Sequence, residues 1–174
     1  MKNEALFTSN TAEWGTPQWI VDRLEAEFGK FDLDPAASKT NHKAPTYFSL
    51  LDDGVDGLEQ PWFGKVFLNP PYGRHPMGIN WAKKVRKELQ SKRKKSPQLI
   101  VCLIPVRSET QWWKTYLEVA SEVRFFEGRL AFEAVGGQND TESATFPSAL
   151  LICRPRMKWV TYGTPMYSYT SAKQ

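Results

Sequence analysis

The tetrapeptide Asn69-Pro70-Pro71-Tyr72 holds the residue types in this chain that are best suited to chemistry. It follows residues 65–68, whose apolar character and length predict a β-strand that ends in this loop. Two consecutive prolines have no N–H to donate, and Pro71 favours an extended conformation of Pro70. The loop therefore offers mainly acceptors, the Asn69 side-chain oxygen and the Pro70 carbonyl, beside the flat ring of Tyr72. These groups predict a pocket for a planar group that bears an NH2. The alternative is an ordinary proline-rich turn after a core strand.

The same tetrapeptide resembles the catalytic motif of amino-methyltransferases, which methylate exocyclic or amide nitrogens with S-adenosylmethionine as the methyl donor. An exocyclic amine on adenine is a poor nucleophile because its lone pair is delocalised into the ring. Acceptors at Asn69 and Pro70 would hold both N–H bonds and favour a pyramidal nitrogen whose lone pair faces the methyl group. This chemistry needs no metal ion and no strong general base, in keeping with a chain that has two histidines. A base inside a duplex must be flipped out to reach the loop, with Tyr72 stacking on it.

The stretch from Trp14 to Pro17 leads into a helix that the apolar spacing predicts over residues 17–28. Thr16 suits the N-cap, Pro17 suits the first helical position, and Gly29 can end the helix. One interpretation is an ordinary capped helix. The other is that Trp14, Thr16 and Pro17 line a cofactor site, because free N–H groups at a helix start can meet a carboxylate.

Acidic residues follow the next apolar segment. Residues 31–33 read as a short strand that leads into Asp34-Pro35-Ala36, and ligands of open α/β sheets bind at the carboxyl ends of strands. Asp34 could hold the positive amino group of a methionine moiety, or it could belong to a simple turn. Further along, Asp52, Asp53 and Asp56 form an acidic patch. Asp56 is the one predicted to accept a hydrogen bond from the ribose or the adenine of the cofactor.

A helix predicted over residues 79–89 carries basic side chains on its polar face, and a further basic run follows at 92–95. A solvated surface is the usual explanation for such a run, but beside a base-sized pocket it also predicts a track for DNA phosphates. The residues predicted to bind DNA are Arg74, Lys83, Lys84, Lys87, Arg107 and Arg129.

The remaining elements alternate between strands and helices, which predicts an α/β fold. Residues 99–104 and 148–153 read as buried strands, and Ser108 with Gln111 forms a capping-box pattern for a helix between them. Glu127-Gly128 predicts a tight hairpin between strands at 123–126 and 129–132.

The chain has 174 residues and a net charge of +4, which fits one domain and permits a polyanionic partner. We expect a single domain over residues 1–174, with a core at about 13–154 and a tail at 155–174. There is no apolar run of membrane-spanning length and no signal peptide. Cys102 and Cys153 lie in apolar runs and are predicted to be small core residues, so neither a disulfide nor a metal site is expected.

Over residues 13 to 154 the chain is similar to the phage-type DNA N6-adenine methyltransferases, the Dam-like enzymes of bacteriophages and prophages. The elements that carry this resemblance are Trp14-x-Thr16-Pro17, Asp34-Pro35-Ala36, Asn69-Pro70-Pro71-Tyr72, Pro105-x-Arg107 with Trp112-Trp113, Gly128-Arg129-Leu130-x-Phe132, and Phe146-Pro147-Ser148.

This resemblance implies a class I methyltransferase (Rossmann-like) fold, a doubly wound, mostly parallel sheet with an antiparallel terminal hairpin strand. It also implies S-adenosylmethionine as cofactor, DNA as substrate, and action in the cytoplasm of a bacterial host. One departure is that Ala36-Ala37-Ser38 replaces the usual glycine-rich cofactor loop.

Two other classes of function are compatible with the motif. One is an amino-methyltransferase that acts on RNA or on protein glutamine, and the other is a catalytically inactive DNA-binding module. The intact Asn69 motif argues against the inactive module, and the basic run at 83–95 argues against a protein substrate. Because nothing in this sequence resembles a separate recognition domain, a short or relaxed target is expected, read by loops such as 73–78 and 133–145.

Overall fold

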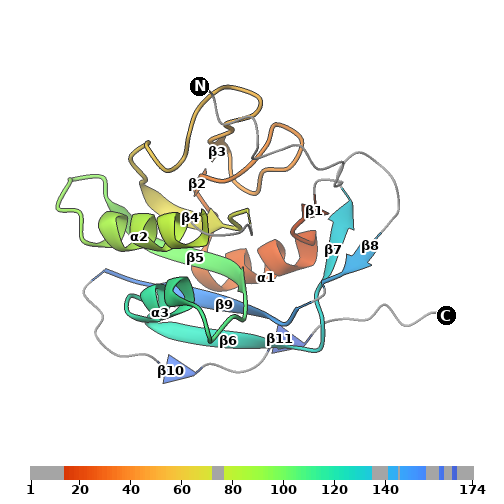
Figure 1. Ribbon diagram of the computed structural model, residues 1–174. Helices are drawn as coiled ribbons and strands as arrows, with labels where there is room; N and C mark the ends of the chain where they lie inside the picture. The colour runs from red at the N-terminus through yellow and green to blue at the C-terminus, as the bar shows by residue number, and fades with distance from the viewer. Residues whose placement is uncertain are drawn as a thin grey trace.

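The computed structural model describes residues 14–71, 77–134, 141–144, 146–155, 161–162 and 166–167, which form a mixed α/β structure whose helices all lie before residue 122 (Figure 1). The helices are α1 (Gln18–Phe28), α2 (Met77–Leu89) and α3 (Gln111–Leu117). The strands are β1 (Trp14–Gly15), β2 (Leu33–Asp34), β3 (Thr46–Tyr47), β4 (Gly64–Leu68), β5 (Pro97–Pro105), β6 (Glu122–Glu127), β7 (Ala131–Ala134), β8 (Thr141–Ser143), β9 (Ser148–Cys153), β10 (Thr161–Tyr162) and β11 (Met166–Tyr167).

The main sheet has the strand order β10-β6-β9-β5-β4-β2-β3, and β11 also pairs with β6. Strands β3, β2, β4 and β5 run parallel, whereas β9 runs antiparallel to both β5 and β6 and lies between them. The sheet is therefore mostly parallel, as expected. Its antiparallel strand is an interior one, and β10 and β11, from the segment expected to be a tail, extend the edge of the sheet.

The hairpin expected around Glu127-Gly128 does not form. β6 pairs with β9, whereas β7 leaves the main sheet and pairs with β1 and β8 in a separate sheet of three strands. Gly128 has a φ of 76°, which turns the chain out of the main sheet. Leu130 and Phe132 are then buried against the α1 side of the core, so packing and not local turn chemistry decides the partner of β7.

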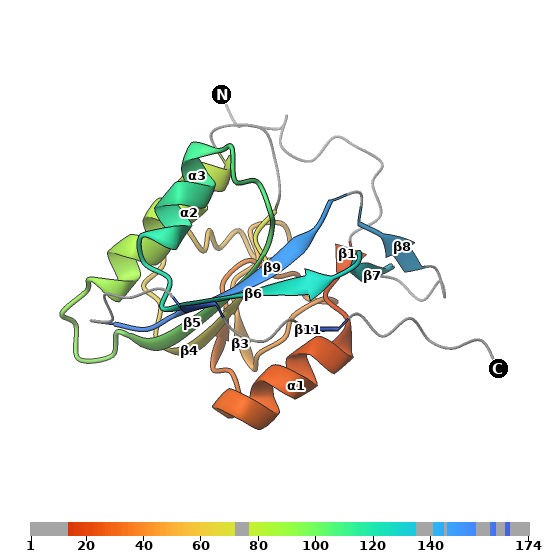
Figure 2. The same ribbon diagram turned by 90° about the horizontal axis from the view of Figure 1, so that it is seen from below.

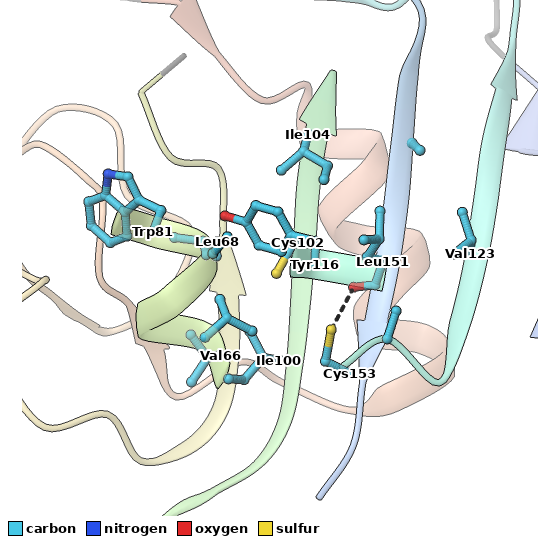
Figure 3. Close-up of a cluster of buried hydrophobic side chains, with 14 of the residues drawn as sticks. Val66, Leu68, Trp81, Ile100, Cys102, Ile104, Tyr116, Val123, Leu151 and Cys153 are labelled. Atoms are coloured by element: carbon cyan, nitrogen blue, oxygen red, sulfur yellow. Dashed lines mark hydrogen bonds between the residues drawn. The ribbon is translucent and has the colours of Figure 1, made fainter. Parts of the chain in front are cut away.

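Helices cover both faces of the main sheet, α1 on one face and α2 with α3 on the other (Figure 2). Side chains that alternate along the central strands feed two apolar clusters. On the α2 and α3 face, Val66, Leu68, Ile100, Cys102 and Ile104 pack with Trp81 and Tyr116 (Figure 3). Cys102 and Cys153 are both buried free thiols, which confirms that they are core residues. Burial raises the pKa of the Cys102 thiol well above its ordinary value.

The helix ends differ in detail from the sequence expectation. α1 begins at Gln18 and has no side-chain cap, so Thr16 is not its N-cap, while Gly29 ends the helix with a φ of 81°. The cap of α3 is Thr110, whose hydroxyl accepts from the Trp113 N–H, and the expected cap at Ser108 is wrong.

No helix in the described ranges combines the length and the apolar character needed to cross a membrane. Within these ranges there is also no group of three or more His, Cys, Asp or Glu residues that could hold a metal ion.

Candidate active site

The carboxyl ends of the parallel strands bring the predicted site loops to one edge of the main sheet. Leu33 pairs with Val66 and Leu68 pairs with Cys102, so the loops that follow β2, β4 and β5 are neighbours. Because β9 reverses direction between β5 and β6, the carboxyl end of β6 lies at this same edge. We call this end of the sheet, formed by the carboxyl ends of β2, β4, β5 and β6, the site edge.

The side chain of Asn69 is held by Thr16, a residue 53 positions earlier in the chain. The Asn69 Nδ2 group donates to Thr16 Oγ1 over 3.0 Å. Thr16 is only 2% exposed, and the first turn of α1 begins directly after it, with the Ile20 N–H bonded to the Pro17 carbonyl. The structure therefore joins two of the predicted site segments, the approach to α1 and the loop after β4.

A cavity of about 400 Å³ opens beside the Asn69 loop. It lies over the ends of β4 and β5, and α2 and α3 contribute one wall. Its lining consists of Pro70, Pro71, Gly78, Ile104, Pro105, Arg107, Glu109, Thr110, Trp112, Tyr116 and Phe146.

The polar and aromatic groups of the cavity come from elements that the sequence does not visibly connect. The Arg107 guanidinium lies over the Phe146 ring, 5.6 Å from its centre. Trp112 is half-buried and lines the cavity, whereas its neighbour Trp113 is buried in the core. The sequence placed Trp112-Trp113 and Phe146 among the elements that carry the family resemblance but predicted no role for them. The half-buried setting of Trp112 and Phe146 depends on the tertiary fold.

Gly78, in the first turn of α2, is a further residue that sequence reasoning missed. A Cβ atom at this position would lie 3.1 Å from the Trp112 ring, so the glycine leaves room for that ring at the cavity wall. The only local sign was a glycine inside a predicted loop at 73–78.

Asp34 lies at the end of β2 and is buried, with 4% of the residue exposed. Its carboxylate accepts hydrogen bonds from the backbone N–H groups of Lys43, at 3.0 Å, and Ala36, at 3.4 Å. Burial raises the pKa of Asp34 to about 6, although these two hydrogen bonds oppose that shift. The carboxylate therefore holds the shape of the loop that replaces the usual glycine-rich segment.

The loop before β4 is in contact with the loop after β2. At Gly57 a Cβ atom would lie 1.9 Å from the Pro35 carbonyl oxygen, so only glycine fits there. Asp56, the preceding residue, accepts from the Leu58 N–H at 2.9 Å. This contact brings two predicted cofactor residues, Asp34 and Asp56, onto adjoining loops. Gly57 was missed because its close neighbour is distant in sequence.

The other aspartates of the acidic patch differ from Asp56. Asp52 Oδ2 accepts from the Lys39 N–H at 2.6 Å and from the Ser49 hydroxyl at 2.8 Å. The Lys39 N–H, followed by the Ser49 hydroxyl, lowers the pKa of Asp52. Asp52 and Asp53 are both exposed, and Asp52 stabilises its loop through these two hydrogen bonds.

Lys84 corrects the expected set of DNA-binding residues. Its ammonium group pairs with Glu88 at 2.7 Å, and the two side chains are only 5% and 4% exposed. It also donates to the Gln60 carbonyl at 2.7 Å and lies 5.6 Å from the centre of the Trp62 ring. A buried ion pair of this kind cannot reach a phosphate, so Lys84 is a structural residue.

The other basic side chains divide by position. Arg107 and Arg129 are exposed at the site edge, and Arg129 donates to the Ala144 carbonyl at 3.2 Å. Lys83 and Lys87 are exposed along α2. The run at 92–95 comes just before the amino end of β5, so it lies at the opposite edge of the sheet.

Three predicted residues are described only partly or not at all. Tyr72 and Arg74 lie outside the described residues. Of Trp14 the structure describes the backbone, which pairs with Ala134 of β7.

Comparison with known proteins identifies the family. A family model described as DNA N-6-adenine-methyltransferase (Dam) matches residues 5–173. A curated relative from Escherichia phage T1, named DNA N-6-adenine-methyltransferase, is 29% identical over 128 residues, which cover 72% of this chain and 49% of the relative. The chain thus spans about half the length of the curated relative that it matches. Since the family model covers nearly the whole chain, the protein belongs to the DNA N-6-adenine-methyltransferase (Dam) family.

Proposed function

We propose that this chain transfers a methyl group from S-adenosylmethionine to the exocyclic N6 amine of a flipped-out adenine in DNA. The observation that carries the proposal is the placement of Asn69 and Pro70 beside the cavity at the site edge. The cavity volume of about 400 Å³ falls in the range of about 300–1,000 Å³ that is common for small-ligand sites. Family membership supports the same activity.

In this mechanism the chain acts mainly by placing the amine. The Asn69 side-chain oxygen and the Pro70 carbonyl accept the two N–H bonds of the adenine amine, so that its lone pair points out of the ring plane. Pro70 is buried and followed by Pro71, which keeps its carbonyl in a fixed direction. Preorganised acceptors of this kind stabilise the charge that develops on the nitrogen. Tyr72 stacks on the base, and the excess proton passes to water.

The residues present fit a methionine-containing cofactor. Asp34 and Asp56 place two carboxylates on loops that touch at Pro35 and Gly57, where no Cβ atom has room. Carboxylates suit an ammonium group and sugar hydroxyls as partners. When bound, S-adenosylmethionine supplies an electrophilic methyl group on a sulfonium. Asp34 then acts chiefly by shaping the loop with its hydrogen bonds to Ala36 and Lys43, and Asp56 offers the more accessible carboxylate.

The architecture is consistent with a class I methyltransferase fold that forms one domain. Helices on both faces, the parallel strands and the inserted antiparallel β9 support a doubly wound arrangement. DNA phosphates then meet Arg107 and Arg129 at the site edge, with Lys83 and Lys87 along α2. In this proposal the enzyme acts on DNA in the cytoplasm of a bacterial host.

Transfer of a radiolabelled methyl group to duplex DNA, RNA and a glutamine peptide tests the proposal. We expect label on DNA adenine with the wild type. Asn69→Ala should reduce the rate by roughly 100-fold or more, because it removes one preorganised acceptor. Asn80→Ala, which changes an exposed asparagine on α2, is the matched control and should keep full activity. Labelling of RNA or peptide in place of DNA, or normal activity of Asn69→Ala, would overturn the proposal.

A further inference from the structure

The contact between Thr16 and Asn69 assigns a task to Thr16 that its place before a helix does not explain. A threonine before Pro17 is expected to cap α1, yet α1 has no side-chain cap. The hydroxyl accepts instead from Asn69 Nδ2, at 3.0 Å. The Thr16 hydroxyl thus bonds to the loop after β4 and does not cap α1.

The Thr16 hydroxyl is held in place from both sides. On one side, Gly15 pairs with Glu133 of β7 as part of β1. On the other, the Ile20 N–H bonds to the Pro17 carbonyl over 3.1 Å and starts α1. Thr16 is 2% exposed, and a β-branched side chain has few accessible rotamers. The acceptor that faces Asn69 is therefore fixed before any ligand binds.

This contact matters because the Asn69 carboxamide has its donor and its acceptor on different atoms. When the nitrogen is bonded to Thr16, the oxygen points away from Thr16. In the proposed reaction the oxygen must accept from the substrate amine. The flipped amide would present its NH2 group to the NH2 group of the substrate, which places donor against donor.

We propose that Thr16 is a positioning residue that holds the Asn69 side chain with its amide nitrogen on Thr16 and its amide oxygen turned away, as the proposed reaction requires. This inference rests on the proposed methyl transfer, and it differs from the expectation that Thr16 lines the cofactor site. The two roles predict different kinetics. A positioning residue affects the turnover number, whereas a cofactor contact affects the affinity for S-adenosylmethionine.

Thr16→Val separates them, because valine keeps the branched shape and removes the acceptor. We expect kcat at saturating cofactor and DNA to fall roughly tenfold to a hundredfold, the range for a missing hydrogen bond that leaves a reacting group misplaced. The dissociation constant of S-adenosylmethionine, measured by calorimetry, should stay within about twofold, since the inference gives Thr16 no contact with the cofactor. Thr16→Ser keeps the hydroxyl and should retain kcat within about threefold.

Thr115→Val is the matched control. Thr115 is also a buried threonine, at 4% exposure, but its hydroxyl donates to the Gln111 carbonyl within α3 and does not contact Asn69. It should leave kcat unchanged, so an effect specific to Thr16 cannot come from the loss of any buried hydroxyl. If Thr16→Val does not fold, Thr16→Ala and Thr16→Ser give the same comparison, with serine active and alanine impaired.

The outcomes are distinct. Loss of kcat with unchanged cofactor affinity and a restored rate in the serine variant supports the inference. Unchanged kcat, weakened cofactor binding with normal turnover at saturation, or equal loss in the serine variant overturns it. If wild-type protein methylates no DNA at all, the proposed function itself fails, and that result is visible before any Thr16 variant is measured.

Discussion

Asp34 carries an ionisable group into the interior next to the site edge, where two backbone N–H groups meet its oxygens. Two N–H donors compensate only part of the loss of water around a carboxylate, and the pKa is raised to about 6. The residue keeps the loop after β2 in place but carries an ionisation penalty at neutral pH. That balance is a property of one side chain, and it can be measured through the pH dependence of stability.

We expect the free energy of unfolding to fall with rising pH because of Asp34. The pKa of its carboxyl is about 6 in the folded chain and near its ordinary value of 3.8 in the unfolded chain. The folded state therefore binds the proton more tightly, so the stabilisation is complete below about pH 3.8 and is lost as the pH rises through 6. The difference corresponds to roughly 3 kcal/mol.

Urea unfolding between pH 4 and 7 measures this effect, with Asp34→Asn as the comparison. Asparagine cannot ionise, so the stability of the variant should fall less over this range. The absolute stability of the variant should be lower at pH 4, because the amide matches the two N–H donors less well. Parallel pH profiles for the two proteins would contradict the prediction.

At the scale of elements, the two ends of α2 have different roles: the carboxyl-terminal half anchors the helix and the first turn lines the cavity. Its carboxyl-terminal half is fastened to the segment before β4 through Lys84 and Glu88, which also accepts from the Trp62 N–H at 3.2 Å and pairs with Arg93. Its first turn places Gly78 against Trp112 at the cavity wall. The same helix thus carries a buried ion pair in one half and a residue of the cavity wall in its first turn.

Adjacent lysines of α2 should behave differently when they are mutated. Lys84→Ala removes the buried ammonium group from Glu88 and leaves Arg93 as its ion-pair partner, so the protein should lose roughly 3 kcal/mol of stability. Lys83→Ala changes an exposed side chain and should alter stability by no more than about 0.5 kcal/mol. Chemical denaturation of both variants checks the contrast. Equal stability losses would mean that the buried pair does not hold α2.

Gly78→Ala should lower activity more than stability. Alanine favours the helix by up to about 1 kcal/mol. Its Cβ, however, would lie 3.1 Å from the Trp112 ring, so this ring of the cavity wall would have to shift by a few tenths of an ångström. We expect kcat/KM for DNA to fall roughly tenfold, since small displacements at a reacting site are costly. Gly78→Ala combined with Trp112→Phe gives the ring more room and should recover part of the loss. No recovery in the double variant would show that the ring is not the cause.

For the whole molecule, the position of the positive charges matters more than their sum of +4. Arg107 and Arg129 stand at the site edge, whereas the run at 92–95 lies beyond α2, a helix about 20 Å long, at the other edge of the sheet. Within that run, Arg93 is engaged with Glu88 and with the Trp62 carbonyl. A duplex held against the cavity would meet the first group and not the second.

The salt dependence of DNA binding tests this arrangement. Changing Arg107 and Arg129 to Gln should make the slope of log affinity against log salt shallower by about 0.9 for each phosphate that the variant no longer neutralises. Changing Lys92, Lys94 and Lys95 to Gln should leave the slope unchanged. The sequence of the methylated site should stay the same in both variants, because phosphate contacts carry no base information directly. A shallower slope only in the lysine variant would move the DNA track to the opposite edge.

The sequence by itself determined the central helices and strands and the order of the site segments. The apolar spacing predicted α1 and α2, the apolar runs predicted β4, β5 and β9, and glycine at position 29 marked the end of α1. The loops after β2 and β4 were placed at strand ends, where the structure has them. These features depend on neighbours within a few residues, which is why periodicity and turn chemistry detect them.

Only the tertiary structure decided which of these segments meet. It gave Thr16 a partner 53 residues away, buried Lys84 beside Glu88, inserted β9 between β5 and β6, and sent β7 into a second sheet. A lysine on a predicted polar face and a threonine before a helix look alike whether they face solvent or another element. Their roles are set by long-range packing, because burial changes the energy of a charge or a hydroxyl, and burial is a property of the assembled fold.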